Sequence, residues 1–268
     1  MRKEFRSVSD GHVQITICDE RWYSRDGVDA VTGLPRIDFV PSVTWIASHY
    51  PHGVGFYKWL AAKGWDESQA IKAAAGDKGS RVHRAIVDLI DGHSVPMEAK
   101  YAVGDEAAQE LSLEEYECLM AFARFWEACE PETIEREVTV FNERDGYAGT
   151  MDWIGRLGKP PKGLSEGPWL LDWKTGQSVW PEHELQVSAY LHGDWIREYW
   201  QAADQIPRLG ILQVGYRKNK AGWKLTEVQD QFPLFLAAKQ IWQKESGSVA
   251  PLRKDYPLSL TLAPKVAP

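Results

Sequence analysis

Apolar and polar residues alternate along several segments in the second half of the chain. TIEREVTVF at residues 133–141 alternates as a strand does, and the turn NERDG joins it to GYAGTMDWIGRL at residues 146–157. The turn-rich loop GKPPKGLSEGP then leads to WLLDWK at residues 169–174, which predicts a hairpin. Residues 208–228 alternate as two strands joined by a basic turn, and residues 13–18 predict a strand or hairpin.

Apolar positions recur with helical spacing in the segments that flank these strands. Ser42 lies where a helix N-cap is expected, and Gly92 lies where a helix would end. Ser112 and Glu115 have the spacing of a capping box. The periodicity predicts helices over residues 41–51, 53–63, 66–75, 79–92, 112–129, 181–200 and 232–244.

The chain is long enough and apolar enough to form one large domain or two small ones. It has 268 residues, of which 44% are hydrophobic, and no long polar linker or internal repeat divides it. We therefore expect a single domain over residues 41–245, preceded by an N-terminal extension at residues 1–40. Residues 246–268 are rich in proline, which predicts an extended or mobile tail.

The formal net charge of −7 argues against a protein coated broadly with basic residues. A local basic track can still bind nucleic acid, because metal ions neutralise clustered carboxylates. Cys18, Cys118 and Cys129 are widely spaced and odd in number, so they predict neither a disulfide framework nor a tetrahedral zinc site. The first residues lack the apolar core of a signal peptide, and no run of about 18 apolar residues occurs, so we expect a soluble cytoplasmic protein that does not bind a membrane.

Charged residues interrupt two of the apolar strands. Because successive side chains alternate between faces, Asp172 and Lys174 share one face with Leu170, whereas the tryptophans beside them lie on the other. A desolvated charge is costly unless it is paired or bound to a metal. Asp152 interrupts the preceding strand, so a hairpin would bring Asp152 and Asp172 together at one end of a sheet.

Two neighbouring carboxylates suit a hard divalent cation, which prefers oxygen ligands. A lysine beside them can orient or deprotonate a water molecule and can stabilise negative charge that develops on a phosphate. The pattern of Asp152, Asp172 and Lys174 is therefore the one that metal-assisted hydrolysis of a phosphodiester requires.

The order of the motifs resembles the PD-(D/E)XK nuclease superfamily. A G-x-x-D motif that ends at Asp152 precedes the D-x-K-T motif of residues 172–175, and Q-x-x-x-Y at residues 186–190 resembles the RecB-like exonuclease branch. PSVT at residues 41–44 and the G-x-x-x-H motif that ends at His83 resemble Cas4-like and mitochondrial genome maintenance exonuclease-like proteins.

The resemblance implies an α/β fold with a restriction-endonuclease-like core, in which a central mixed sheet is flanked by helices, and a helical N-terminal portion. It implies Mg²⁺ or Mn²⁺ at the strand ends, bound by His83, Asp152, Asp172 and the backbone carbonyl of Trp173. Lys174 would position the attacking water. The imidazole of His83 also suits Mn²⁺ well.

The resemblance extends to a set of supporting residues. Glu137 lies where related exonucleases often carry an auxiliary acidic residue, and Thr175, Gln186 and Tyr190 would support the lysine strand or contact DNA. Alternatives remain for two of the positions. His83 borders a buried helix face, where a neutral core histidine is common, and Glu137 can instead be an exposed strand residue paired with Arg136 or a lysine, although this alternative applies more to Glu135.

The cysteines separate this chain from one part of the resembling family. Cas4 and AddB-type proteins hold an iron–sulfur cluster through four cysteines, three of them near the C-terminus, whereas no cysteine follows Cys129 here. We therefore expect no iron–sulfur cluster and a closer likeness to cluster-free mitochondrial-type exonucleases and phage-encoded relatives.

The implied function is a metal-dependent exonuclease that acts on free DNA ends, with single strands as the expected substrate and a replication or recombination protein as a partner. One alternative is a double-strand 5′ exonuclease of the phage recombination type. Another is a DNA-binding module that kept the fold without the activity. A small-molecule hydrolase is less well supported, because the chain lacks a glycine-rich phosphate loop and a nucleophile elbow.

Basic and histidine side chains elsewhere suggest further contacts. Arg217, Lys218 and Lys220 form either a solvated turn or, with neighbouring aromatics, a grip on a phosphate backbone. His183 and His192 lie on the predicted helix of residues 181–200, where their spacing predicts solvent exposure rather than a role as ligands.

Overall fold

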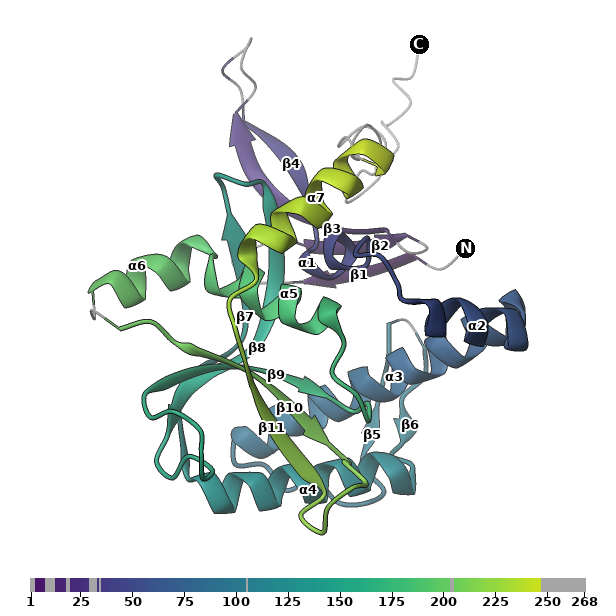
Figure 1. Cartoon of the computed structure of the whole chain (residues 1–268), viewed down its shortest axis with the longest axis vertical. Helices are drawn as coiled ribbons and strands as arrows, with labels where there is room; N and C mark the ends of the chain where they lie inside the picture. The colour runs from purple at the N-terminus through teal and green to yellow at the C-terminus, as the bar shows by residue number, and fades with distance from the viewer. Residues whose placement is uncertain are drawn as a thin grey trace, which may run out of the picture.

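The computed structural model describes residues 3–7, 13–17, 20–28, 33, 35–104, 106–202 and 205–246 of the chain. Cys18 and all but the first residue of the predicted tail lie outside these ranges. The described part contains a five-stranded mixed sheet with helices on both faces and a four-stranded antiparallel sheet beside it (Figure 1). The prediction of an α/β fold with a central mixed sheet flanked by helices is therefore confirmed.

The central sheet has the strand order β11-β10-β9-β8-β7. Only β9 and β10 run parallel, and two helices connect them, as a parallel crossover requires. The other neighbours in this sheet are antiparallel. The strands are β7 (Pro131–Asn142), β8 (Tyr147–Leu157), β9 (Pro168–Lys174), β10 (Arg208–Val214) and β11 (Trp223–Val228).

One face of this sheet is covered by α3 (Trp65–Ile90) and α4 (Leu113–Cys129), of which α4 runs below the sheet in Figure 1. Trp153 and Trp173 are buried between these layers with their ring centroids 6.3 Å apart. Phe122 on α4 and Trp173 meet edge to face with their ring centroids 5.4 Å apart. Large aromatic rings thus fill the space between sheet and helices, which explains why strands β8 and β9 are rich in tryptophan.

The opposite face is covered by α1 (Val43–Ala47), α5 (Pro181–Leu191) and α7 (Phe232–Ser246). Trp45 of α1 and Trp242 of α7 meet edge to face with their ring centroids 5.3 Å apart. The two apolar cores on either side of the sheet fix both of its faces, so polar groups on its middle strands are held in place.

The N-terminal segment forms a four-stranded antiparallel sheet, which is more than the single strand or hairpin predicted there. Ile15 and Trp22 form a cross-strand pair in it and pack into the same core as Trp45 and Trp242. The helical portion predicted at the start of the domain follows this sheet and begins at Val43. The strands are β1 (Lys3–Ser7), β2 (Val13–Ile17), β3 (Glu20–Val28) and β4 (Pro35–Pro41).

Two predicted helix boundaries are wrong. The helices expected over residues 66–75 and 79–92 form one continuous helix, α3, which runs through Gly76 and Gly79. Each glycine costs only about 0.5–1 kcal/mol relative to alanine in a helix. The burial of the apolar stripe around Val82 and the packing against α4 outweigh that cost.

The helix expected over residues 181–200 is divided into α5 and α6 (Asp194–Ala202). Asn142 at the end of β7 donates a 2.9 Å hydrogen bond to the carbonyl of His192, which ends α5. At Gly193 an added Cβ would lie 2.9 Å from the Cβ of Val140, so the close approach of β7 requires a glycine there.

The predicted helix caps are confirmed. The Ser42 side chain accepts a 3.1 Å hydrogen bond from the backbone N–H of Trp45, and Ser112 and Glu115 form both bonds of a capping box. Within the described ranges, no helix has the length and apolar character needed to cross a bilayer. The remaining elements are α2 (Val54–Lys63), β5 (Lys100–Tyr101) and β6 (Gln109–Glu110).

Candidate active site

The hairpin of β8 and β9 brings the two predicted aspartates together. The register that pairs Trp153 with Leu171 places Asp152 beside Asp172 on the adjoining strand. The Asp152 carboxylate accepts a 2.7 Å hydrogen bond from the backbone N–H of Trp173. Both carboxylates are buried, as expected for polar groups on strands whose two faces are covered.

The predicted division of β9 into two faces is confirmed. Leu170 packs into the core beneath α5, whereas Trp169, Leu171 and Trp173 pack into the core beneath α3 and α4. Asp172 shares the face of Leu170, so it lies under α5 at the point where the apolar core ends.

Lys174 is held between Asp172 and the helix above it. Its ammonium lies 2.6 Å from Oδ2 of Asp172 and donates a 3.1 Å hydrogen bond to Oε1 of Gln186. Gln186 in turn donates a 2.7 Å hydrogen bond to the hydroxyl of Tyr190, one helical turn further along α5. The predicted pair of Gln186 and Tyr190 therefore fixes the position of the lysine.

His83 projects from α3 to the same end of the hairpin. Its Nδ1 atom lies 3.3 Å from Oδ1 of Asp152, and its Nε2 atom lies 3.0 Å from the backbone carbonyl of Trp173. The imidazole thus contacts two of the predicted metal ligands at once. A quarter of its side chain is exposed, in contrast to the fully buried Val82 beside it, so it lies at the edge of the core rather than within it.

Glu137 joins this group through an unusual backbone conformation. Its φ of 50° is in the left-handed region, where a side chain other than glycine is strained by about 1–2 kcal/mol. Ligand atoms of Glu137, His83 and Asp152 lie within 4.8 Å of one another, close enough to share a metal ion. Glu135 is exposed, so only one of the two glutamates on this part of β7 reaches the site.

The charges of the buried groups shift one another's pKa values. Burial by itself lowers the pKa of His83, but the charge of Asp152 and the hydrogen bond to it raise the pKa to about 9. Burial raises the pKa of Asp152, yet His83 and Lys174 bring it below its usual value. Asp172 has a pKa raised to about 6, because burial and the charge of Asp152 outweigh the attraction of Lys174.

These groups line a cavity of about 700 Å³. Its walls are the middle of β7 and β8, the end of β9, the small residues of α3 from Ala75 to Ser80, the first turn of α5 and the N-terminal sheet. Thr175 lies in the wall directly after Lys174. The predicted catalytic and metal-binding side chains therefore converge on one water-accessible space.

His183 also lines the cavity and is half-buried, so it is less exposed than predicted. Burial and the charge of Lys174 lower its pKa to about 3, which keeps the ring neutral. Its Nδ1 accepts a 3.3 Å hydrogen bond from the backbone N–H of Trp180, so the proton resides on Nε2. The sequence signal for this position was Pro181, which begins α5 a few residues after Lys174 and so places His183 in the first turn next to the lysine. His192 instead stacks on Phe232, away from the cavity.

The N-terminal sheet supplies three lining residues that sequence patterns did not identify. They are Gln14 of β2 and Arg21 and Tyr23 of β3. The Tyr23 hydroxyl accepts a hydrogen bond from Gln14 and lies 3.1 Å from the hydroxyl of Thr150 on β8. Alternation along β3 was the available signal, since Arg21 and Tyr23 lie on the face opposite to the buried Trp22.

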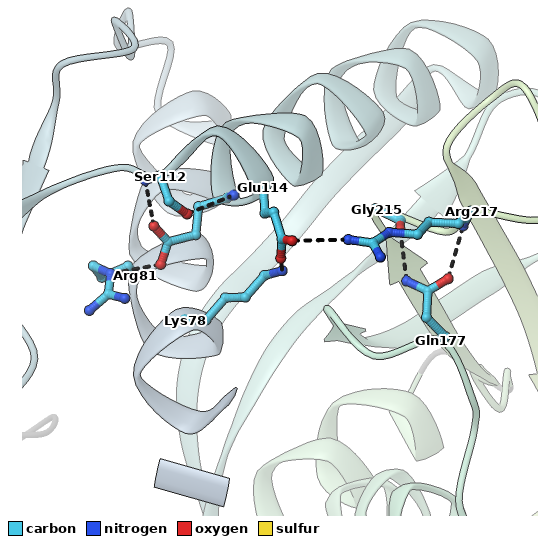
Figure 2. A network of polar contacts seen from close by, with 8 residues as sticks. Lys78, Arg81, Ser112, Glu114, Gln177, Gly215 and Arg217 are labelled. Carbon is cyan, nitrogen blue, oxygen red and sulfur yellow. Dashed lines mark hydrogen bonds and ion pairs between the residues drawn. The ribbon is translucent and has the colours of Figure 1, made fainter. Parts of the chain in front are cut away.

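The predicted basic turn lies outside the cavity lining. Lys218 and Lys220 are exposed, and Arg217 forms a 3.2 Å ion pair with Glu114 of α4. Gln177 donates a 2.8 Å hydrogen bond to the carbonyl of Gly215 and accepts one of 2.9 Å from the backbone N–H of Arg217 (Figure 2). These contacts attach the loop that follows Lys174 to the turn and, through Glu114, to α4.

The same network continues into α3. Lys78 lies 2.9 Å from Glu114, and Arg81 lies 2.7 Å from the buried Glu115 (Figure 2). Because Lys78 and Arg81 belong to the stretch of α3 that carries His83, these ion pairs fix the helix that lines the cavity. The described cysteines, Cys118 and Cys129, are buried and free.

Comparisons with known proteins leave the family of the chain open. No protein-family model matches the sequence, and no curated protein is significantly similar to it.

Proposed function

We propose that the protein is a metal-dependent exonuclease that hydrolyses phosphodiester bonds from free DNA ends, with single strands as its preferred substrate. The observation that carries this proposal is the buried contact of Asp172 with Lys174, next to Asp152 and His83, in the wall of one cavity. Two neighbouring buried carboxylates repel each other, so such a site is poorly explained by stability alone. The resemblance of the motifs to PD-(D/E)XK nucleases supports the same function.

The residues present fit a divalent cation. In the described part of the chain, Oδ1 of the buried Asp172 accepts no hydrogen bond, which leaves it available as a ligand. Asp152, Asp172, the carbonyl of Trp173 and His83 would hold the ion, with Glu137 nearby. Oxygen donors with one imidazole suit Mg²⁺ and, better, Mn²⁺. A bound divalent cation would stabilise negative charge on the phosphate and lower the pKa of a water molecule.

The chain's own groups would orient the reactants. Lys174 is fixed by Asp172 and Gln186, so its ammonium can hold a water molecule and stabilise the charge that develops on the phosphate. Burial and the charge of Asp172 raise the pKa of Tyr190, so this hydroxyl stays protonated and keeps Gln186 in position. The neutral His183 can donate a hydrogen bond from Nε2 to a phosphate oxygen.

The shape of the site favours a single strand. The cavity has the central sheet, α3 and the N-terminal sheet on different sides, which leaves a confined space around the carboxylates. Trp180 is 59% exposed and lines the cavity, so its ring is available to stack on an unpaired base.

The test is cleavage of end-labelled linear single-stranded DNA, linear duplex and circular single-stranded DNA with Mg²⁺, Mn²⁺ or EDTA. We expect metal-dependent loss of the linear single strand and none of the circle. Lys174→Ala should lower the rate by about 100-fold or more, because a charge-stabilising donor is lost. Lys162→Ala, on the exposed loop between β8 and β9, is the matched control and should retain full activity.

The other outcomes distinguish the alternatives. Preferential loss of the duplex would indicate a double-strand exonuclease. Binding without cleavage under any condition would indicate a DNA-binding module without activity. Full activity of Lys174→Ala, with normal thermal unfolding, would contradict the assignment of this residue.

A further inference from the structure

We propose that the N-terminal sheet carries a second phosphate-binding subsite, in which Arg21 binds the phosphodiester next to the one that is cleaved. This inference rests on the proposed nuclease function and adds to it a requirement on substrate length. The subsite lies in the segment before residue 41, which the resemblance to known nucleases does not include.

The two faces of the β2–β3 pair contact different parts of the molecule. Ile15 and Trp22 pair across the strands and are buried in the core with α1 and α7. Gln14, Arg21 and Tyr23 belong to the opposite face and line the cavity. Alternation along the strands therefore directs one set of side chains to the core and the other to the candidate active site.

Hydrogen bonds attach this face directly to the strand that carries Asp152. The Tyr23 hydroxyl lies 3.1 Å from that of Thr150, which lies 3.2 Å from the hydroxyl of Thr139 on β7. Thr150 and Asp152 are two residues apart on β8 and both line the cavity. Arg21 is thus held on a wall that is joined to the carboxylate site but is separate from β9.

Arg21 differs from the other cations of the cavity in having no side-chain partner among the residues that the structure describes. Lys174 contacts Asp172, His83 contacts Asp152, and Arg84 donates a hydrogen bond to the carbonyl of Ala102. In the ranges that the structure describes, the guanidinium of Arg21 makes no ion pair or hydrogen bond. A half-buried guanidinium is the side chain best suited to bind a phosphate with two parallel hydrogen bonds.

The subsite predicts a difference between short and long substrates. The cleaved phosphate would lie at Asp172 and Lys174, whereas Arg21 on the other sheet would hold its neighbour along the strand. An ester with one phosphodiester, such as bis(p-nitrophenyl) phosphate, offers nothing to Arg21. A decathymidylate offers both phosphates.

The experiment compares Arg21→Ala with wild type on these two substrates in the presence of Mn²⁺. We expect kcat/KM on decathymidylate to fall about 10- to 100-fold, mainly through KM, as the loss of a charge-assisted hydrogen bond predicts. The rate on bis(p-nitrophenyl) phosphate should be unchanged. Arg21→Lys should recover part of the loss, because it keeps the charge and loses the planar fork.

Arg25→Ala is the matched control. Arg25 lies on the same face of β3, two strand repeats further on, but pairs with Glu143 outside the cavity lining, so its removal should leave both rates unchanged. Thermal unfolding of each variant shows whether a loss is due to misfolding. An equal loss on both substrates, or none on either, would overturn the inference.

Binding of fluorescent decathymidylate in EDTA separates this inference from the proposed function. If wild type cleaves neither substrate but Arg21→Ala still weakens binding about 10-fold relative to Arg25→Ala, the subsite stands and the nuclease function fails. If wild type cleaves both substrates and Arg21→Ala binds the oligonucleotide as tightly as wild type, the nuclease function stands and the subsite fails.

Discussion

At the scale of single residues, the buried carboxylates Asp172 and Glu115 differ in how their surroundings shift their pKa values. Around Asp172, burial and the charge of Asp152 outweigh the attraction of Lys174, so the pKa of Asp172 is raised to about 6. At Glu115 the reverse holds: burial raises the pKa of Glu115, but hydrogen bonds from Ser112 and the contact with Arg81 lower it below its ordinary value. The first arrangement suits the binding of a cation, and the second stabilises the fold.

The Glu115 site predicts a pH dependence of stability. A carboxylate whose pKa is lower in the folded state stabilises the protein above its unfolded pKa, which is near 4.5, and loses this effect as the pH falls through the folded pKa. Glu115→Gln keeps the capping hydrogen bonds but removes the charge. We expect it to lower the free energy of unfolding by about 1–3 kcal/mol at pH 7, and to have much less effect at pH 3.

Urea unfolding at the two pH values measures this effect. Glu117→Gln, at an exposed position on the same helix, is the control and should change little at either pH. A destabilisation by Glu115→Gln that is equally large at pH 3 would show that packing, not charge, fixes this residue.

At the scale of elements, the contact between β8 and α5 explains the glycine in the G-x-x-D motif. A Cβ added at Gly149 would lie 2.5 Å from the ring of Tyr190 and 3.0 Å from Val43. The absence of a side chain at Gly149 therefore lets Tyr190 lie close to the strand, where it supports Gln186 and through it Lys174.

Gly149→Ala should consequently lower both stability and activity. The added methyl group must displace Tyr190 or Val43, which costs about 1–3 kcal/mol of unfolding free energy. Because Tyr190 is also the partner of Gln186, we expect the cleavage rate to fall about 10-fold or more, with Lys174 less well positioned. Gly55→Ala in α2, where an added Cβ meets nothing within 4 Å, should leave the rate unchanged and stability equal or higher. Thermal unfolding and single-turnover cleavage of both variants, at saturating enzyme, test this difference.

The elements also show what the sequence can and cannot predict. The hairpin with Asp152 and Asp172 was predictable because its two strands are adjacent in the chain and fix each other's register. The burial that keeps His183 neutral and the wall around Arg21 were not predictable, because both depend on contacts between segments that are distant in the sequence. The prediction of a break in α3 was wrong for the same reason. Glycine is a local signal for the end of a helix, and packing against α4 outweighs it.

At the scale of the whole molecule, the N-terminal sheet and the central sheet share one core. Trp22 of β3 lies 5.0 Å from Trp45 of α1 and 5.9 Å from Trp242 of α7, ring centroid to ring centroid. Because this cluster joins elements from the two ends of the described chain, a boundary near residue 41 does not separate two cores. The wall that carries Arg21 should therefore unfold together with the rest of the protein.

Trp22→Ala tests this cooperativity, since it removes a fully buried ring from the centre of the cluster. We expect a loss of about 3–5 kcal/mol in the free energy of unfolding and a single transition in urea, seen alike by tryptophan fluorescence and by far-ultraviolet circular dichroism. Trp22→Phe keeps most of the volume and should lose less. Two separate transitions would instead show that the N-terminal sheet unfolds as a unit of its own. In that case Arg21 would be held only while the sheet is docked, and Trp22→Ala should weaken binding of decathymidylate at urea concentrations where the central sheet is still folded.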